Sequence, residues 1–174
     1  MHRRLQEMVD LSATNVALGT LSAKRSVQWV QHLEKLLNGV APSPDDSYEC
    51  VGTRYLVGVL ICVFVKVRHR PHVSDVQDAV APVGIMGVMG NKGGAAVRFR
   101  IYDSSMCFVC AHLAAHQNAI AERNADFANI MAKTEFRDDA RSEALAAARG
   151  AASLTDNGTF GILDHGTRIY LCSE

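Results

Sequence analysis

Three short, near-continuous apolar runs limit what this chain can fold into. They span residues 56–65, 95–101 and 106–111, and valine, isoleucine and phenylalanine are frequent in them. Each run is well short of the roughly 20 apolar residues that a membrane-spanning helix needs. Apolar runs of this kind are typical of strands that are covered on both faces. We therefore predict three buried strands, and a last short strand over residues 168–172.

The segments around these runs predict two helices and one solvated loop. Apolar residues recur at helical spacing over 22–38, and Gly39 follows as a stop signal, while Trp29 is expected to pack in the core. A second helix is expected over 115–136, with an inward stripe that consists of Ile120, Phe127, Ile130 and Met131 and that also carries Asn124. The charged segment 68–79 is predicted to be a solvated loop with a short turn or edge segment. Strands and helices together indicate an α/β fold.

Charge and cysteine content exclude several classes of function. The 174 residues carry 18 Lys and Arg against 18 Asp and Glu, so net charge does not favour nucleic acid or an anionic membrane. No apolar segment follows the basic start of the chain, so a cytoplasmic location is expected. The odd number of cysteines, five, favours a reducing compartment. Cys107 and Cys110 form a C-x-x-C on a predicted strand, where they would face opposite sides, which disfavours a zinc or redox site.

The glycine-rich stretch 84–100, GIMGVMGNKGGAAVRFR, allows two interpretations. It is not a Walker A loop, because Lys92 lies between Asn91 and Gly93, and it is not a dinucleotide fingerprint, because a strand follows it. Asn91 and Lys92 at its tip offer an amide and a cation that suit an anionic ligand. The glycines are equally suited to a tight connection between two buried strands.

Four motifs in order carry a resemblance to a known family. They are LQEMVDL (5–11), LVGVLICVFVK (56–66), GIMGVMGNKGGAAVRF (84–99) and HLAAHQNAIAERNADFANI (112–130). Together they resemble the inositol polyphosphate 5-phosphatases, within the endonuclease/exonuclease/phosphatase superfamily. The resemblance implies a partial four-layer α/β/β/α sandwich and Mg²⁺-dependent removal of the 5-phosphate from inositol polyphosphates or phosphoinositides. The ligand would be such a head group, with peripheral contact to a membrane as a further implication and no nucleic acid.

The same resemblance implies roles for individual residues. Glu7 would bind the metal, since Mg²⁺ prefers oxygen ligands, and His112 would contact the scissile phosphate. The alternative for His112 is a structural histidine at a strand end. Asn91 and Lys92 would lie beside the substrate groove, and Arg123 with Asn124 would support or contact bound phosphates. A zinc site of the H-x-x-x-H type is disfavoured, because Leu113 stands where a glutamate is needed.

The resemblance covers residues 5–136, and the family motifs expected beyond them are missing. We therefore expect residues 1–174 to be an incomplete catalytic domain, with 138–160 as a variable insertion, an open sheet edge and no activity alone. The main alternative is a non-catalytic degenerate fragment with at most weak phosphate binding. A superfamily nuclease is a second alternative, which the neutral charge disfavours.

Overall fold

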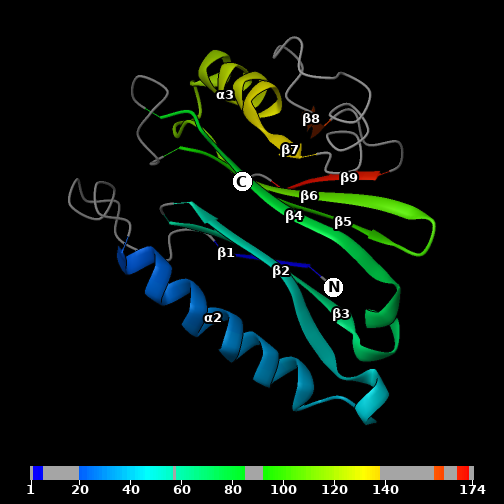
Figure 1. Ribbon diagram of the computed structural model, residues 1–174. Helices are drawn as coiled ribbons and strands as arrows, with labels where there is room; N and C mark the ends of the chain where they lie inside the picture. Colours follow the sequence, from blue (N-terminus) through cyan, green and yellow to red (C-terminus); the bar gives the residue numbers. More distant parts are fainter. Residues whose placement is uncertain are drawn as a thin grey trace, which may run out of the picture.

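The structure, a computed structural model, describes residues 2–5, 20–56, 58–84, 92–137, 159–162 and 168–172. Within these, two helices cover two stacked sheets (Figure 1). Helix α2 (Thr20–Asn38) packs on the first sheet, and helix α3 (Ile120–Lys133) lies over the second. The predicted α/β/β/α layering is thereby confirmed.

The first sheet contains β1 (His2–Leu5), β2 (Tyr48–Leu56) and β3 (Val59–Lys66) in the order β1-β3-β2, with every pair antiparallel. The apolar run 56–65, which we predicted to be one strand, belongs to two. Gly58 interrupts it with a φ of 77°, a conformation that glycine adopts without steric cost, and β2 and β3 form a hairpin around it. All residues of β3 but its last are buried.

The second sheet has the order β4-β5-β6-β9, formed by β4 (Val73–Pro82), β5 (Gly93–Ile101), β6 (Ser104–His112) and β9 (Arg168–Cys172). Its pairs are antiparallel except β6 with β9, which are parallel. The segment 68–79, predicted to be largely a loop, instead forms the 3-10 helix η2 (Val67–His72) and most of the edge strand β4. The predicted strand 168–172 is confirmed as β9.

Alternation along the strands creates two separate cores. The first core lies between the two sheets and contains alternate residues of three strands. These are Val59, Ile61, Val63 and Val65 of β3, Ala95, Val97 and Phe99 of β5, and Phe108 and Cys110 of β6. The opposite face of the second sheet presents Ala96, Cys107, Val109 and Ala111 to α3 and its neighbours. Cys107 and Cys110 therefore lie on opposite faces, as the sequence predicted.

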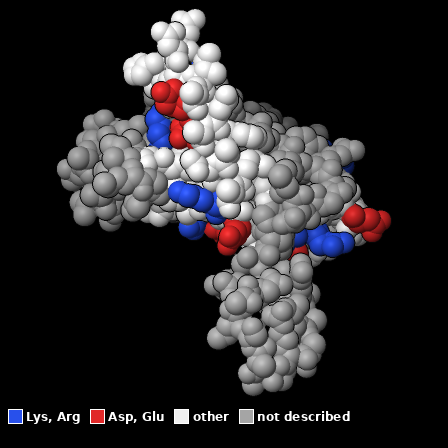
Figure 2. Space-filling model, turned by 90° about the horizontal axis from the view of Figure 1, so that it is seen from above, with Lys and Arg blue, Asp and Glu red and all other residues white. Residues whose placement is uncertain are grey.

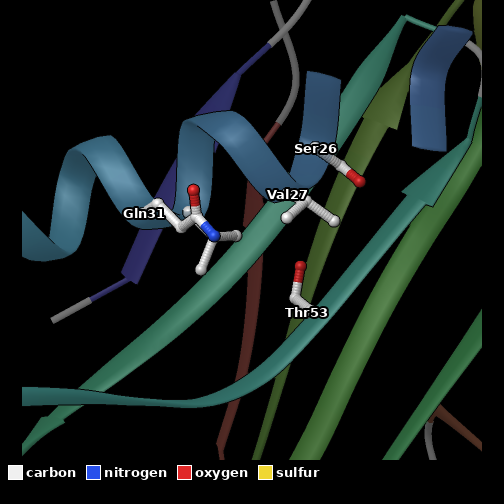
Figure 3. A pocket seen from close by; sticks show the side chains of 5 residues that line it. Ser26, Val27, Gln31 and Thr53 are labelled. Carbon is white, nitrogen blue, oxygen red and sulfur yellow. The ribbon is translucent and has the colours of Figure 1, made fainter. Parts of the chain in front are cut away.

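Helix α2 is less buried than its apolar spacing predicts. Trp29 and Leu36 are 38% and 56% exposed, and Val40, just after the helix, is 82% exposed, so the prediction that Trp29 packs in the core is wrong. Trp29 instead makes an edge-to-face contact with His32 on the outer side of the helix. Between α2 and β2 lies an apolar pocket of about 270 Å³, lined by Ser26, Val27, Val30, Gln31 and Thr53 (Figure 3).

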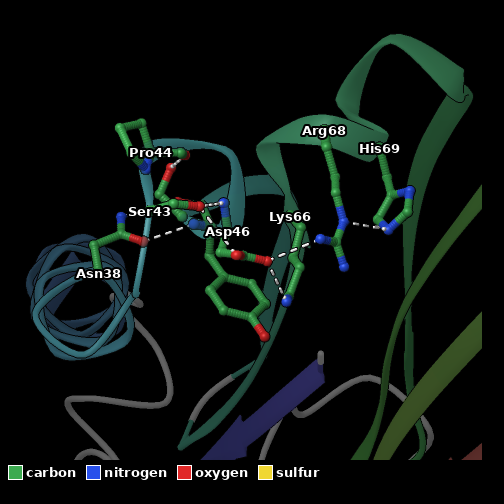
Figure 4. Close-up of polar contacts among 9 residues, drawn as sticks. Asn38, Ser43, Pro44, Asp46, Lys66, Arg68 and His69 are labelled. Carbon is green, nitrogen blue, oxygen red and sulfur yellow. Dashed lines mark hydrogen bonds and ion pairs between the residues drawn. The ribbon is translucent and has the colours of Figure 1, made fainter.

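Polar contacts connect α2 to the first sheet (Figure 4). The Asn38 side chain, in the last residue of α2, accepts a hydrogen bond from the Tyr48 amide at 2.6 Å and donates to the Tyr48 carbonyl at 3.0 Å. Asp46, in the 3-10 helix η1 (Pro44–Asp46), binds Lys66 at 2.7 Å and Arg68 at 2.9 Å. The hydrogen bond from Lys66, with help from Ser43, lowers the pKa of the Asp46 carboxyl. These contacts fix the turn between α2 and β2.

The helix predicted over 115–136 is shorter at both ends. Residues 113–119 form a turn before α3, and His116 has a φ of 79°, which no helical residue adopts. After α3, Glu135–Arg137 form the strand β7, which pairs with β8 (Thr159–Gly161). The predicted insertion 138–160 lies almost entirely outside the described residues. None of the described helices is long and apolar enough to span a membrane.

Candidate functional site

The candidate site lies where β5 begins and β6 ends. His112 is the last residue of β6 and pairs with Gly93, the first residue of β5. Lys92, which immediately precedes β5, therefore lies next to His112. The His112 side chain is 4% exposed and Lys92 is half-buried. The sequence order places these two residues 20 positions apart, and the antiparallel register brings them together.

The Lys92 ammonium and the His112 imidazole are hydrogen-bonded. Lys92 Nζ lies 2.8 Å from His112 Nε2. A charged ammonium has donors but no acceptor, so this contact requires Nε2 to accept and assigns the ring proton to Nδ1. The pair therefore places the Lys92 ammonium, which can donate to an anion, beside an imidazole at a strand end.

The glycines next to Lys92 are required by packing. Gly93 has a φ of 150°, and a Cβ there would lie 2.3 Å from the Ala81 carbonyl oxygen and 2.7 Å from Leu56 Cδ2. A Cβ on Gly94 would lie 2.7 Å from Cγ2 of Ile130 on α3. The connection is also closed by the Val83 amide, which donates to the Lys92 carbonyl at 2.9 Å. Of the glycine-rich stretch 84–100, residues 85–91 lie outside the described residues; packing fixes Gly93 and Gly94, and Lys92 adjoins the candidate site.

The segment that follows His112 is bound by two side chains of α3. Asp126 Oδ2 accepts a hydrogen bond from the Ala114 amide at 2.8 Å. Arg123 Nη1 donates to the His116 carbonyl at 2.6 Å, and its Nη2 donates to the Gln117 carbonyl at 3.2 Å. The chain leaving the candidate site is therefore held at three backbone positions.

The predicted inward stripe of α3 is confirmed at Ile130, which is buried, and at Met131, which packs against the second core, but it is wrong at its other members. Ile120 is 61% exposed, Phe127 is 44% exposed and Asn124 is exposed. In the first half of α3, the face that packs on the protein carries Arg123 and Asp126 instead. This part of the face meets polar backbone of the segment 114–117, so charged side chains with hydrogen-bonding partners stand where apolar ones were expected.

The described residues thus place four of the six predicted site residues. Lys92 and His112 are in contact, Arg123 binds the adjacent segment, and Asn124 lies on the outer side of α3. Glu7 and Asn91 lie outside the described residues. Sequence reasoning missed Asp126, although its spacing of three from Arg123 puts both side chains on one face of a helix.

The described residues do not by themselves form a metal site. Within the described ranges, no group of three or more His, Cys, Asp or Glu side chains could hold a metal ion. His112 Nε2 is already bound by Lys92, and His116 is exposed in the turn beyond it. Burial raises the pKa of the Cys107 thiol to about 12, so this residue does not supply a thiolate near neutral pH.

Comparison with known proteins places this architecture in a family. Residues 4–169 match the sequence model of the endonuclease/exonuclease/phosphatase family 2. The chain is 36% identical over 132 residues to synaptojanin of Caenorhabditis elegans and 37% identical over 131 residues to human synaptojanin-1. These matches cover 76% and 75% of this chain, but 11% and 8% of the relatives. A match to the type II inositol polyphosphate 5-phosphatase 14 of Arabidopsis thaliana, 38% identical over 151 residues, covers 86% of this chain and 13% of the relative.

A solved structure shows the same arrangement. The inositol polyphosphate 5-phosphatase domain of SPsynaptojanin, in complex with inositol (1,4)-bisphosphate and a calcium ion, is 29% identical and superposes with a TM-score of 0.64. The match covers 78% of this chain and 36% of that chain. This chain thus spans about a third of the solved domain and about a tenth of the curated relatives. The chain belongs to the endonuclease/exonuclease/phosphatase family, and within it to the inositol polyphosphate 5-phosphatases.

Proposed function

We propose that Lys92 and His112 bind a phosphate group of an inositol polyphosphate or phosphoinositide head group, as part of a site that removes the 5-phosphate. The observation that carries this proposal is the 2.8 Å contact between Lys92 Nζ and His112 Nε2 in a chain of this family. A solved relative is in complex with inositol (1,4)-bisphosphate, which supports a ligand of this class.

The contact suggests how the pair responds to a phosphate. Without ligand, His112 Nε2 accepts the Lys92 hydrogen bond. A phosphate oxygen is a stronger acceptor for the ammonium, so it displaces Nε2 from Lys92. The released Nε2 can then take up a proton from solvent and donate it in a hydrogen bond to a second phosphate oxygen. Lys92 and His112 would thereby stabilise negative charge that develops on the phosphoryl group.

A divalent metal is the second part of the proposal, with Glu7 as a ligand. The family is generally metal-dependent, and the solved relative holds a calcium ion. Mg²⁺ would polarise the phosphoryl oxygen and stabilise the leaving oxygen. Glu7 lies outside the described residues, so the steps above involve only Lys92 and His112. Asn91, Arg123 and Asn124 remain predicted phosphate contacts, and a cytoplasmic location with peripheral membrane contact remains a prediction.

We further propose that these 174 residues alone do not turn over substrate. The match with the solved 5-phosphatase domain covers 36% of that domain, and loss of members of a catalytic unit lowers rates by orders of magnitude. The alternative is a degenerate chain with at most weak phosphate binding. The two differ in whether the head group is bound at Lys92 and His112.

The test is a titration of the purified chain with inositol (1,4,5)-trisphosphate. Replacing Lys92 with Met or His112 with Ala is expected to weaken binding about 10-fold or more, since hydrogen bonds to charged groups contribute roughly 1.5–3 kcal/mol. Lys24→Met, on the exposed face of α2, is the matched control and leaves binding unchanged. If both site variants bind the trisphosphate with the affinity of the wild type, the proposal is contradicted. Phosphate release with Mg²⁺ above the level of His112→Ala contradicts the proposed inactivity.

A nucleic-acid substrate is tested in the same series. On the face seen in Figure 2, Lys and Arg side chains of the described residues lie close to Asp and Glu rather than alone. A mixed surface of this kind gives little attraction to a phosphate backbone. A short oligonucleotide is therefore expected not to compete with the trisphosphate, and competition at 150 mM salt would favour the nuclease alternative.

A further inference from the structure

The segment 113–117 joins the end of β6 to α3, and its backbone is held by charged side chains. We infer that Arg123 and Asp126 are positioning residues: they fix this segment so that the His112 ring stays within reach of Lys92. The inference rests on the proposed function, because it assigns how the phosphate-binding pair is kept in place. It gives Arg123 a role distinct from direct phosphate contact and adds Asp126 to the site.

The two side chains are complementary to the backbone that they meet. Arg123 and Asp126 are three positions apart on α3, so they share one face of the helix, and both are half-buried while their neighbours Glu122, Asn124 and Ala125 are exposed. The carboxylate accepts the Ala114 amide at 2.8 Å, and the guanidinium donates to two carbonyls at 2.6 and 3.2 Å. A planar guanidinium suits two adjacent acceptors.

The conformation of His116 depends on this contact. Its φ of 79° lies in the left-handed region, which a side chain other than glycine rarely adopts. Its carbonyl accepts hydrogen bonds from Arg123 Nη1 at 2.6 Å and from the Ala119 amide at 3.1 Å. The left-handed turn lets the chain reverse from β6 into α3 within a few residues. Arg123 thus stabilises the turn that sets where the end of β6 lies.

The position of His112 is set from both sides. On one side, the register with Gly93 of β5 fixes its backbone. On the other side, β6 ends at His112, Leu113 packs against the second core, and the Ala114 amide donates to Asp126. Freeing Ala114 would let the last residue of β6 fray, as strand and helix ends do when their contacts are removed. The bond between Lys92 and His112 would then lose its geometry.

The experiment reads the His112 ring directly in the 174-residue chain. Imidazole ¹⁵N spectra at pH 7.5 are expected to show the Nδ1–H tautomer in the wild type, because Nε2 accepts from Lys92. Asp126→Ala is expected to convert this signal into a mixture with the Nε2–H tautomer. Asp126→Asn keeps an oxygen acceptor for the Ala114 amide and is expected to retain the wild-type signal. Glu122→Ala, which removes an exposed carboxylate from the same helix, is the matched control.

An unchanged His112 signal in Asp126→Ala overturns the inference. If Asp126→Ala does not fold, Arg123→Gln carries the same expectation, and an unchanged signal there overturns it equally. A change of the same size in Glu122→Ala would also overturn it, because the effect would then belong to the helix as a whole. The tautomer is read without ligand, so it does not depend on the proposed function.

A titration with inorganic phosphate separates the two proposals. If the wild type binds phosphate and Asp126→Ala binds it about 10-fold more weakly, while Asp126→Asn matches the wild type, both are supported. If the wild type does not bind phosphate, the proposed function fails, and the tautomer spectra still decide the positioning role. If Asp126→Ala changes the tautomer but binds phosphate as the wild type does, the positioning role in phosphate binding is overturned.

Discussion

Lys92 Nζ donates to His112 Nε2 at 2.8 Å, across the register that pairs the first residue of β5 with the last residue of β6. Neither residue could reach the other without that register, because 19 residues separate them along the chain. The glycines that follow Lys92 permit the close approach of β4 and α3, so packing and the candidate site depend on the same short segment. A change in this segment therefore affects both stability and binding.

Lys92→Met is predicted to change the protonation geometry of His112 without unfolding the chain. The variant keeps the length of the side chain and removes the donor to Nε2. Without this hydrogen bond to Nε2, the Nδ1–H tautomer of His112 is no longer favoured, and both neutral tautomers should be populated. Imidazole ¹⁵N spectra at pH 7.5 measure this change. A pure Nδ1–H signal in the variant would show that Lys92 does not set the tautomer.

Gly94→Ala is predicted to lower the free energy of unfolding by about 1–3 kcal/mol, the usual cost of overpacking a core. The added Cβ would lie 2.7 Å from Ile130 Cγ2, so α3 would have to move away from β5. Urea unfolding measures the effect. In an Ile130→Ala background the same substitution should cost clearly less, because the clashing methyl is gone. Equal costs in both backgrounds would show that α3 does not pack on Gly94.

The left-handed turn at His116 gives a second stability prediction. A β-branched residue is strained at its φ of 79°, whereas glycine is not. We expect His116→Val to be less stable than His116→Gly by about 1–2 kcal/mol, the typical cost of the left-handed region. Gln117→Val, at an exposed neighbour, serves as the control. If the order of Val and Gly at 116 is reversed in thermal unfolding, the turn does not have the conformation described.

Alkaline pH should destabilise the fold through Cys107. Burial raises the pKa of its thiol to about 12 from the ordinary 9.0, even though Arg98 lowers it slightly. The unfolded thiol therefore ionises first. Its contribution to stability is fully present below pH 9 and is lost as the pH rises toward 12, by up to about 1.4 kcal/mol per pH unit.

Urea unfolding between pH 8 and 10.5 tests this dependence. Cys107→Ala cannot ionise, so its stability should fall less steeply with pH than that of the wild type. The slope is the quantity to compare, because the substitution also leaves a small cavity and lowers stability at every pH. Parallel curves for the two proteins would mean that the Cys107 thiol is not protected by burial.

Apolar patterning predicted the sheets well, because a strand covered on both faces consists of a short, near-continuous apolar run. The runs ending at Ile101 and Ala111 correspond to β5 and β6, and the end of the second run identified His112 as a strand-end residue. Gly58 shows a feature that this pattern does not predict. A glycine inside an apolar run is compatible with a continuous strand, and only its positive φ shows that the run is a hairpin.

Helix faces were predicted less well, because they depend on what the helix meets. The stripe through Ile120 and Phe127 has helical spacing, but α3 turns Arg123 and Asp126 toward a polar backbone segment. Trp29 similarly lies on the outer side of α2. Spacing alone cannot distinguish a face against a sheet from a face against a loop. The role of Asp126 was therefore not predictable from periodicity.

The sequence predicted which residues belong to the candidate site, but it predicted only part of their arrangement in space. Lys92 and His112 were chosen from two separate motifs, and the antiparallel register of β5 and β6 brings them together. That contact requires the strands to pair with Gly93 opposite His112, which no short-range pattern in the sequence specifies.

The central claim, that Lys92 and His112 act together on one phosphate, is tested most directly by a double-mutant cycle. Binding of inositol (1,4,5)-trisphosphate is measured for the wild type, Lys92→Met, His112→Ala and the double variant. We predict that the double variant loses much less affinity than the two single losses combined, with a coupling free energy of about 1 kcal/mol or more, since contacting residues that share a ligand are not independent. Single losses that add to within about 0.3 kcal/mol, or no binding by the wild type, would contradict the account.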